Sequence, residues 1–180
     1  VLGQTPALLR SSRQDAAFWA GMWKTLNEHN HWSGRVWNCR KDGSEYCVWH
    51  TITGVRDLRG RLVRYVAVSR DITDQEAQER DLWRRANFDP LTGLANRVRF
   101  EDRLNQALSH AQRHKHDFAV CYLDLDRFKP VNDQYGHAAG DALLRHVAER
   151  MSAVMRPEDT LARIGGDEFA LLLIGCPLEK

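Results

Sequence analysis

Apolar and polar residues follow two different periods in the N-terminal part of the chain. Over residues 14–29 the apolar side chains recur at the three- and four-residue spacing of an amphipathic helix. From Trp32 the period becomes two, and strand-like runs over residues 32–39, 46–55 and 62–69 are separated by turns that contain Asp and Gly. This pattern predicts one helix followed by a three-stranded antiparallel meander.

Residues 74–86 contain neither Gly nor Pro and are rich in strong helix formers. They are therefore predicted to form a helix whose start Asp71 or Thr73 caps. The apolar seam of this helix is short. Two interpretations stay open, because such a helix can pair with its twin in a dimer or can be a plain surface helix.

The remaining residues predict a mixture of helices and strands after an interruption at Pro90 and Gly93. The expected helices cover residues 96–113, 128–135 and 141–155, and the expected strands cover residues 118–124, 160–164 and 168–174. Leu108 is placed on the buried face of the first of these helices, and Cys121 in a core strand. Together with the meander, these elements predict the α+β fold class.

The composition limits the classes of protein that the chain can belong to. Its 180 residues fit one domain or two small ones, and a formal net charge of +2 does not favour nucleic-acid binding. No apolar run reaches the length of a membrane span, and the first residues given do not show a signal-peptide pattern. We expect a cytoplasmic segment without membrane contact, although a longer parent protein can carry membrane segments upstream. Cys39 and Cys47 flank a turn, but a disulfide between them is not expected in a reducing cytosol.

The most unusual stretch lies between the last two predicted strands, where Gly165-Gly166 is followed by Asp167-Glu168. The two glycines predict a tight hairpin whose backbone can come close to a ligand. A further predicted strand ends in Asp124. If the two strands are neighbours, Asp124 and Asp167 converge, and such carboxylates suit a hard cation that carries a nucleoside triphosphate.

Several short motifs in the C-terminal part occur in the order of a known family. They are Asp89-Pro90-Leu91-Thr92-Gly93-Leu94-Ala95-Asn96-Arg97, Asp124-Leu125-Asp126-Arg127-Phe128-Lys129, Asn132-Asp133, Tyr135-Gly136-His137, Gly140-Asp141 and Gly165-Gly166-Asp167-Glu168-Phe169. On these motifs, the chain from Asp89 onward resembles the GGDEF domain of bacterial diguanylate cyclases. The resemblance implies a nucleotidyl-cyclase-like α/β sandwich that joins two GTP molecules into cyclic di-GMP, releases pyrophosphate and works as a homodimer.

The same resemblance implies roles for individual residues. The implied ligands of Mg²⁺ or Mn²⁺ are three acids, which are also the implied catalytic residues, and one backbone carbonyl: Asp124, Asp167, Glu168 and Leu125. The implied phosphate contacts lie in the hairpin and at the start of a short helix: Gly165, Gly166, Phe128 and Lys129. The implied guanine contacts, for which helix caps remain an alternative, are Asn132 and Asp141. The implied inhibitory site for the product consists of Arg156 and Asp159.

The N-terminal part resembles the C-terminal half of a PAS sensor domain. The motifs that carry this resemblance are Trp32-Ser33-Gly34, Lys41-Asp42-Gly43 and Asp71-Ile72-Thr73. Pro6 stands where light-sensing relatives carry a flavin-reactive cysteine, which excludes covalent flavin photochemistry at that position. Non-covalent flavin or haem stays open, but nothing in the sequence supports it. The implied boundaries are residues 1–73 for the partial PAS domain, 74–87 for a signalling helix and 88–180 for a partial GGDEF domain.

Two functions follow from these resemblances. The first is a diguanylate cyclase controlled by a PAS sensor and by its own product. The alternative is a regulatory GGDEF domain that binds GTP or cyclic di-GMP and controls a downstream phosphodiesterase domain. Because the family's cyclase domain continues well past the hairpin, we expect activity in the full-length parent protein and none in the 180-residue fragment alone.

Overall fold

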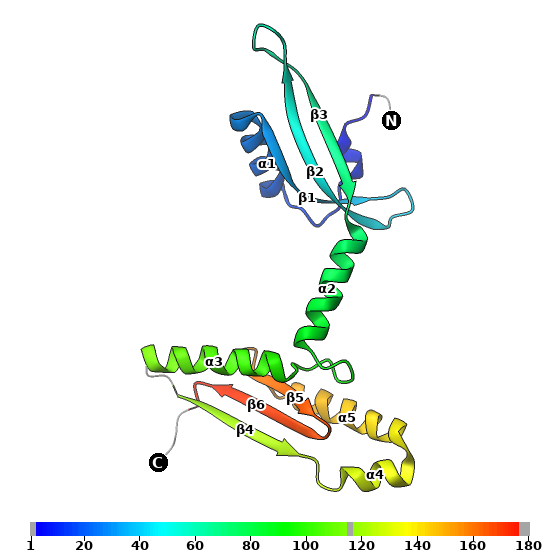
Figure 1. Cartoon of the computed structure of the whole chain (residues 1–180), viewed down its shortest axis with the longest axis vertical. Helices are drawn as coiled ribbons and strands as arrows, with labels where there is room; N and C mark the ends of the chain where they lie inside the picture. Colours follow the sequence, from blue (N-terminus) through cyan, green and yellow to red (C-terminus); the bar gives the residue numbers. More distant parts are fainter. Residues whose placement is uncertain (1–2, 115–116, 177–180) are drawn as a thin grey trace. The chain divides into compact units, whose positions relative to one another are not determined.

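A computed structural model describes residues 3–114 and 117–176 of the chain (Figure 1). The chain divides into two compact units, one up to Arg80 and one from Asp81 onward. None of the helices in the described ranges is both long enough and apolar enough to cross a membrane.

The N-terminal unit contains the predicted helix and meander. A short 3₁₀ helix, η1 (Pro6–Leu9), precedes α1 (Ala16–His29), which is followed by strands β1 (His31–Cys39), β2 (Glu45–Arg56) and β3 (Leu62–Asp71). The strands pair antiparallel in the order β1-β2-β3. Asp15 is the N-cap of α1, because its carboxylate accepts a hydrogen bond of 2.8 Å from the N–H of Phe18.

Helix α1 lies against one face of this sheet (Figure 1), and aromatic side chains join the two. The ring of Phe18 meets Trp32 of β1 edge-on, and Trp23 meets Tyr65 of β3 in the same way. Met22 and Leu26 of the helix are buried. The predicted helix and meander are therefore confirmed, and apolar burial between them forms the core of this unit.

The two cysteines of the N-terminal unit are free thiols. They do not face each other across the strand pair, because Cys39 lies opposite Glu45 and Cys47 lies opposite Trp37. Burial raises the pKa of the Cys47 thiol.

Helix α2 (Thr73–Asn87) covers the predicted linker, and the division between the two units falls inside it. Asp71 caps its start by accepting a hydrogen bond of 2.9 Å from the N–H of Thr73. The Thr73 hydroxyl accepts a hydrogen bond of 3.1 Å from the N–H of Cys47 on β2. An ion pair of 2.8 Å joins Glu76 to Arg35 of β1. The first turn of α2 is thus attached to the N-terminal sheet by side-chain hydrogen bonds rather than by apolar burial, since α2 has no buried residue.

The C-terminal unit is an α/β sandwich around a three-stranded antiparallel sheet. Its helices are α3 (Arg97–His114), α4 (Phe128–Tyr135) and α5 (His137–Ser152), and its strands are β4 (Phe118–Asp124), β5 (Thr160–Gly165) and β6 (Glu168–Ile174). The strand order is β4-β6-β5, so β6 is central. Successive residues of β6 point to opposite faces of the sheet and belong to two separate hydrophobic clusters. Ala170 and Leu172 pack with Phe100 of α3, and Phe169 packs with Leu144 of α5. The sheet therefore lies between α3 and α5.

Three expectations for this unit were wrong. Helix α5 begins at His137 rather than at residue 141, because the single residue Gly136, at φ 82°, both ends α4 and precedes α5. Leu108 is 42% exposed, because the stripe of α3 that meets the sheet runs through Phe100 and leaves Leu108 at its margin. Cys121 is exposed, because β4 pairs only with β6 within the described ranges and its outer side lies uncovered there.

Candidate functional site

The hairpin between β5 and β6 has two glycines with different structural roles. Gly166 has φ 54°, in the left-handed region where glycine is favoured. Gly165 does not have a positive φ, and a Cβ built on it would meet no atom within 4 Å. The turn itself therefore requires glycine at position 166, but the surrounding fold would accept a side chain at position 165.

Strands β4 and β6 bring the predicted acidic residues to one end of the sheet. Asp124 lies directly opposite Glu168 in the antiparallel register, so the two side chains leave the same face. The N–H of Leu125 donates a hydrogen bond of 3.3 Å to the backbone carbonyl of Asp167. The strands are thus neighbours, as the interpretation of the hairpin required. Asp124 and Glu168 are exposed, and Asp167 is half-buried.

The donor chemistry at this end fits a hard divalent cation, because carboxylate and carbonyl oxygens are the ligands that Mg²⁺ and Mn²⁺ prefer. Within residues 3–114 and 117–176, no three side chains of His, Cys, Asp or Glu lie close enough together to hold a metal ion by themselves. A metal ion here would need the Leu125 carbonyl, phosphate oxygens or water to complete its coordination.

A cavity of about 340 Å³ opens at the same end of the sheet. Its lining comes from the start of α3, the end of β4 and the hairpin: Arg97, Tyr122, Leu123, Asp124, Ile164 and Glu168. Sequence reasoning assigned no role to Arg97. The signal that was available is its place at the end of the Asp89–Arg97 motif, but only the fold shows that this residue reaches the acidic end of β4.

Arg163 is a second residue that the sequence reasoning missed. Its guanidinium donates two hydrogen bonds, of 2.9 and 2.7 Å, to the carbonyl of Gly166. The same group pairs with Asp89 at 3.1 Å, and the two side chains are only 13% and 16% exposed. Arg163 therefore ties the hairpin turn to the segment that precedes α3. The available signal was a charged residue placed between the apolar residues Ala162 and Ile164 of a predicted strand.

Asp89 also accepts two hydrogen bonds from Thr92, one of 2.8 Å from its N–H and one of 2.6 Å from its hydroxyl. Burial raises the pKa of the Asp89 carboxyl, but the hydrogen bonds from Thr92 and the charge of Arg163 lower it by more. The net result is a pKa below the ordinary value. The Asp89 carboxyl is therefore ionised at neutral pH and can pair with Arg163.

The predicted guanine contacts lie on two helices that pack against each other. Gly140 of α5 is buried, and a Cβ built on it would stand 2.0 Å from Oδ1 of Asn132 and 3.1 Å from the ring of Phe128. This close approach places the Asn132 side chain next to the turn of α5 that carries Asp141. The alternative that these two residues cap helices is wrong. Asp141 is the fifth residue of α5, and Asn132 lies inside α4, so neither stands at a helix end.

The start of α4 holds the other predicted phosphate contacts. Phe128 is the first residue of α4 and packs in the cluster formed with α5. Lys129 follows it and is exposed. Phe128 and Lys129 therefore lie four and five residues beyond Asp124 along the chain.

Arg156 and Asp159 lie in the loop before β5. The carboxylate of Asp159 accepts a hydrogen bond of 2.9 Å from the N–H of Ile174 and one of 3.3 Å from the N–H of Arg156. Asp159 therefore ties this loop to the end of β6. The Arg156 side chain is exposed.

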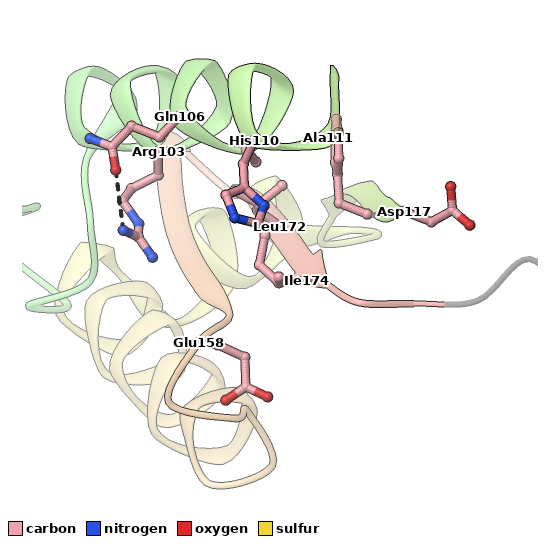
Figure 2. A pocket seen from close by; sticks show the side chains of 10 residues that line it. Arg103, Gln106, His110, Ala111, Asp117, Glu158, Leu172 and Ile174 are labelled. Atoms are coloured by element: carbon pink, nitrogen blue, oxygen red, sulfur yellow. Dashed lines mark hydrogen bonds between the residues drawn. The ribbon is translucent and has the colours of Figure 1, made fainter. Parts of the chain in front are cut away.

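A cavity of about 300 Å³ adjoins this loop (Figure 2). Its floor is apolar and includes Leu172 and Ile174, while Arg103 and Glu158 stand at its rim. Arg103 donates a hydrogen bond of 3.3 Å to the side chain of Gln106, which also lines this cavity.

Comparison with known proteins identifies the class to which this site belongs. The family model described as "Diguanylate cyclase, GGDEF domain" matches residues 86–180, which is more than half of the chain. The chain therefore belongs to the GGDEF diguanylate cyclase domain family. The N-terminal antiparallel sheet lies outside the matched residues.

Individual relatives agree with this family. The chain is 46% identical over 145 residues to the probable diguanylate cyclase DgcE of Escherichia coli, a match that covers 81% of this chain and 13% of DgcE. It is 46% identical over 123 residues to the cyclic di-GMP phosphodiesterase PdeB of Shewanella oneidensis, which covers 68% of this chain and 14% of PdeB. The chain thus spans about one seventh of these relatives.

A solved structure has the same fold over the C-terminal part. The coiled coil and GGDEF domain of DgcB from Caulobacter crescentus, in complex with c-di-GMP, matches with a TM-score of 0.56 and 34% identity. The match covers 59% of this chain and 56% of that one.

Proposed function

We propose that the protein is a diguanylate cyclase that makes cyclic di-GMP from two GTP molecules and releases pyrophosphate. The observation that carries this proposal is Gly165, which lies beside the acidic end of β4 and β6 although the fold would accept a side chain there. A backbone without a Cβ at this point lets a phosphate chain lie against the hairpin. The family to which the chain belongs supports the same conclusion.

Asp124, the carbonyl of Leu125 and Asp167 are the groups that would hold a Mg²⁺ or Mn²⁺ ion, with Glu168 beside them. When bound, the metal supplies positive charge that offsets the charge of the triphosphate. The 3′-hydroxyl of each GTP attacks the α-phosphate of the other. In each of the two attacks the bond from the α-phosphorus to the oxygen that bridges to the β-phosphate breaks, so two pyrophosphates leave for one cyclic di-GMP. Glu168 is the proposed acceptor of the hydroxyl proton, because it is exposed and leaves the same face as Asp124.

The remaining site residues bind the substrate in this proposal. Gly165 and Gly166, with Phe128 and Lys129 at the start of α4, bind phosphate through N–H groups and one ammonium. Asn132 and Asp141 bind guanine, since an amide and a carboxylate complement its donors and its acceptor.

The proposal extends to assembly and control. Each cyclase domain holds one GTP, so the working enzyme is a homodimer in which two sites face each other. Arg156 and Asp159 bind cyclic di-GMP and thereby restrain its synthesis. Residues 1–73, proposed as part of a PAS domain, pass a signal through helix α2, and the protein acts in the cytoplasm.

A regulatory role is the second candidate function. Its support is the 46% identity to the phosphodiesterase PdeB, whose name describes an enzyme that degrades cyclic di-GMP. In that case the hairpin would bind GTP without turnover and control a phosphodiesterase domain elsewhere in the protein.

The experiment that separates these functions is incubation of the protein at its natural length with GTP and Mg²⁺, followed by mass spectrometry of the nucleotides. The cyclase proposal expects cyclic di-GMP from the wild type and none from the Asp167→Ala and Glu168→Ala variants. The control is Asp133→Ala, which removes an exposed carboxylate of α4 and should leave activity unchanged. Binding of GTP without product would support the regulatory role instead.

A further inference from the structure

The start of α3 places Arg97 beside the end of β4. It is the first residue of α3, and the side chain of Asn96 caps that helix by accepting a hydrogen bond of 3.0 Å from the N–H of Arg99. Phe100, one turn further, is only 1% exposed, and its ring meets Tyr122 of β4 edge-on. Because Tyr122 and Asp124 leave the same face of β4, this packing sets Arg97 on the side of the sheet that carries Asp124.

Arg97 lines the 340 Å³ cavity together with Asp124 and Glu168. Among the described residues that line this cavity, Arg97 is the only one with a positively charged side chain. Over residues 3–114 and 117–176, the Arg97 guanidinium has neither a carboxylate oxygen within 4.0 Å nor a hydrogen-bond acceptor. A cation and two carboxylates thus face one cavity without pairing with each other. This arrangement differs from that of Arg163, whose donors are used within the fold.

The charges of this cavity favour a particular ligand. Two carboxylates and one guanidinium sum to −1, and a divalent cation on the carboxylates would change the sum to +1. A phosphate chain can then contact both the cation and the guanidinium, whose planar fork of N–H donors matches phosphate oxygens. A neutral base or sugar would leave the guanidinium without an anionic partner.

We propose that Arg97 is a phosphate-binding residue that contacts the triphosphate chain of GTP bound at the end of β4. This inference rests on the proposed function, because it assumes that a nucleoside triphosphate occupies the site. It adds to that function a cation from α3 that reaches the phosphates from the side of the sheet opposite α4 and α5.

The test measures binding by the protein at its natural length, in the presence of Mg²⁺, of two probes. One is α,β-methylene GTP, which cannot release pyrophosphate, and the other is guanosine, which has no phosphate. The variants are Arg97→Ala, Arg97→Lys and, as a matched control, Arg113→Ala, which removes an exposed arginine at the other end of the same helix. Thermal unfolding of each variant is recorded alongside.

The proposal expects Arg97→Ala to raise the Kd for the GTP analogue about tenfold, the usual effect of losing a hydrogen bond between charged groups. The Kd for guanosine and the unfolding temperature should stay unchanged, Arg97→Lys should recover part of the affinity, and Arg113→Ala should behave as the wild type.

Equal Kd values for the analogue in Arg97→Ala and Arg113→Ala, with binding by the wild type intact, would overturn this inference and leave the proposed function standing. A parallel loss of guanosine binding and of unfolding temperature would also overturn it, because Arg97 would then be structural. Failure of the wild type to bind the analogue would instead overturn the proposed function and this inference with it.

Discussion

Arg163 and Asp89 show how single residues fix the hairpin. The guanidinium spans from the Gly166 carbonyl to a carboxylate 74 positions earlier in the chain, and both side chains are largely buried. Removing one member of such a pair leaves the other charge without a partner in a place that water reaches poorly. The turn that carries Asp167 therefore depends on a residue far from it in sequence.

This network predicts a pH-dependent stability. Because the folded-state pKa of Asp89 lies below its ordinary value of 3.8, its contribution is complete above that value and is lost as the pH falls through the folded-state pKa. Asp89→Asn should lower the free energy of unfolding by about 1–2 kcal/mol at pH 7, and the difference from the wild type should shrink below about pH 4. Urea unfolding between pH 7 and pH 3 measures this difference in the free energy of unfolding. The control is Asp133→Asn, which neutralises an exposed carboxylate. A difference that does not change with pH would contradict the assignment.

The two glycines of the hairpin predict opposite outcomes for the same substitution. Gly166→Ala places a side chain at φ 54° and should lower the free energy of unfolding by about 1–2 kcal/mol. Gly165→Ala meets open space and should leave stability unchanged or slightly higher, while it raises the KM for GTP by blocking the approach of phosphate. Chemical denaturation and GTP titration distinguish the two effects. Unimpaired use of GTP by Gly165→Ala would remove the main support for a phosphate at this backbone.

At the scale of elements, the contact between α4 and α5 controls the proposed guanine site. A Cβ at Gly140 would collide with the Asn132 side chain, so Gly140→Ala should push Asn132 aside. We expect a loss of more than about 1 kcal/mol in stability and weaker binding of guanosine.

The matched control for this substitution is Gly21→Ala in α1, where a Cβ meets nothing within 4 Å. In that position alanine should stabilise the helix by up to about 1 kcal/mol. Differential unfolding of the two variants and guanosine titration provide the measurements. Tight guanosine binding by Gly140→Ala would show that Asn132 does not read the base.

Hydrophobic periodicity predicted the existence and type of every long element, because an amphipathic stripe or an alternating strand is a local property. It failed where an outcome depends on contacts between elements. The start of α5 followed from Gly136, which the sequence marks as a stop for α4 but not as the residue directly before the next helix. The positions of Arg97 and Arg163 beside the hairpin arise from pairing between β4, β5 and β6 and the packing of α3, and no local pattern encodes those distances.

At the scale of the whole molecule, the chain holds two units and only part of the length of its relatives. Residues at both ends of α2 are tied to their own unit. In the N-terminal unit Glu76 pairs with Arg35, and in the C-terminal unit Arg99 stacks on the rings of Trp83 and Phe88. Each end of α2 therefore contacts residues of the unit to which it belongs.

The most direct test of the cyclase proposal is the stoichiometry of the reaction catalysed by the protein at its natural length with GTP and Mg²⁺. The account predicts that two GTP are consumed and two pyrophosphate released for each cyclic di-GMP formed, with a rate per molecule that rises with protein concentration as dimers form. Bound GTP with no pyrophosphate release, or hydrolysis to GDP and phosphate, would contradict it.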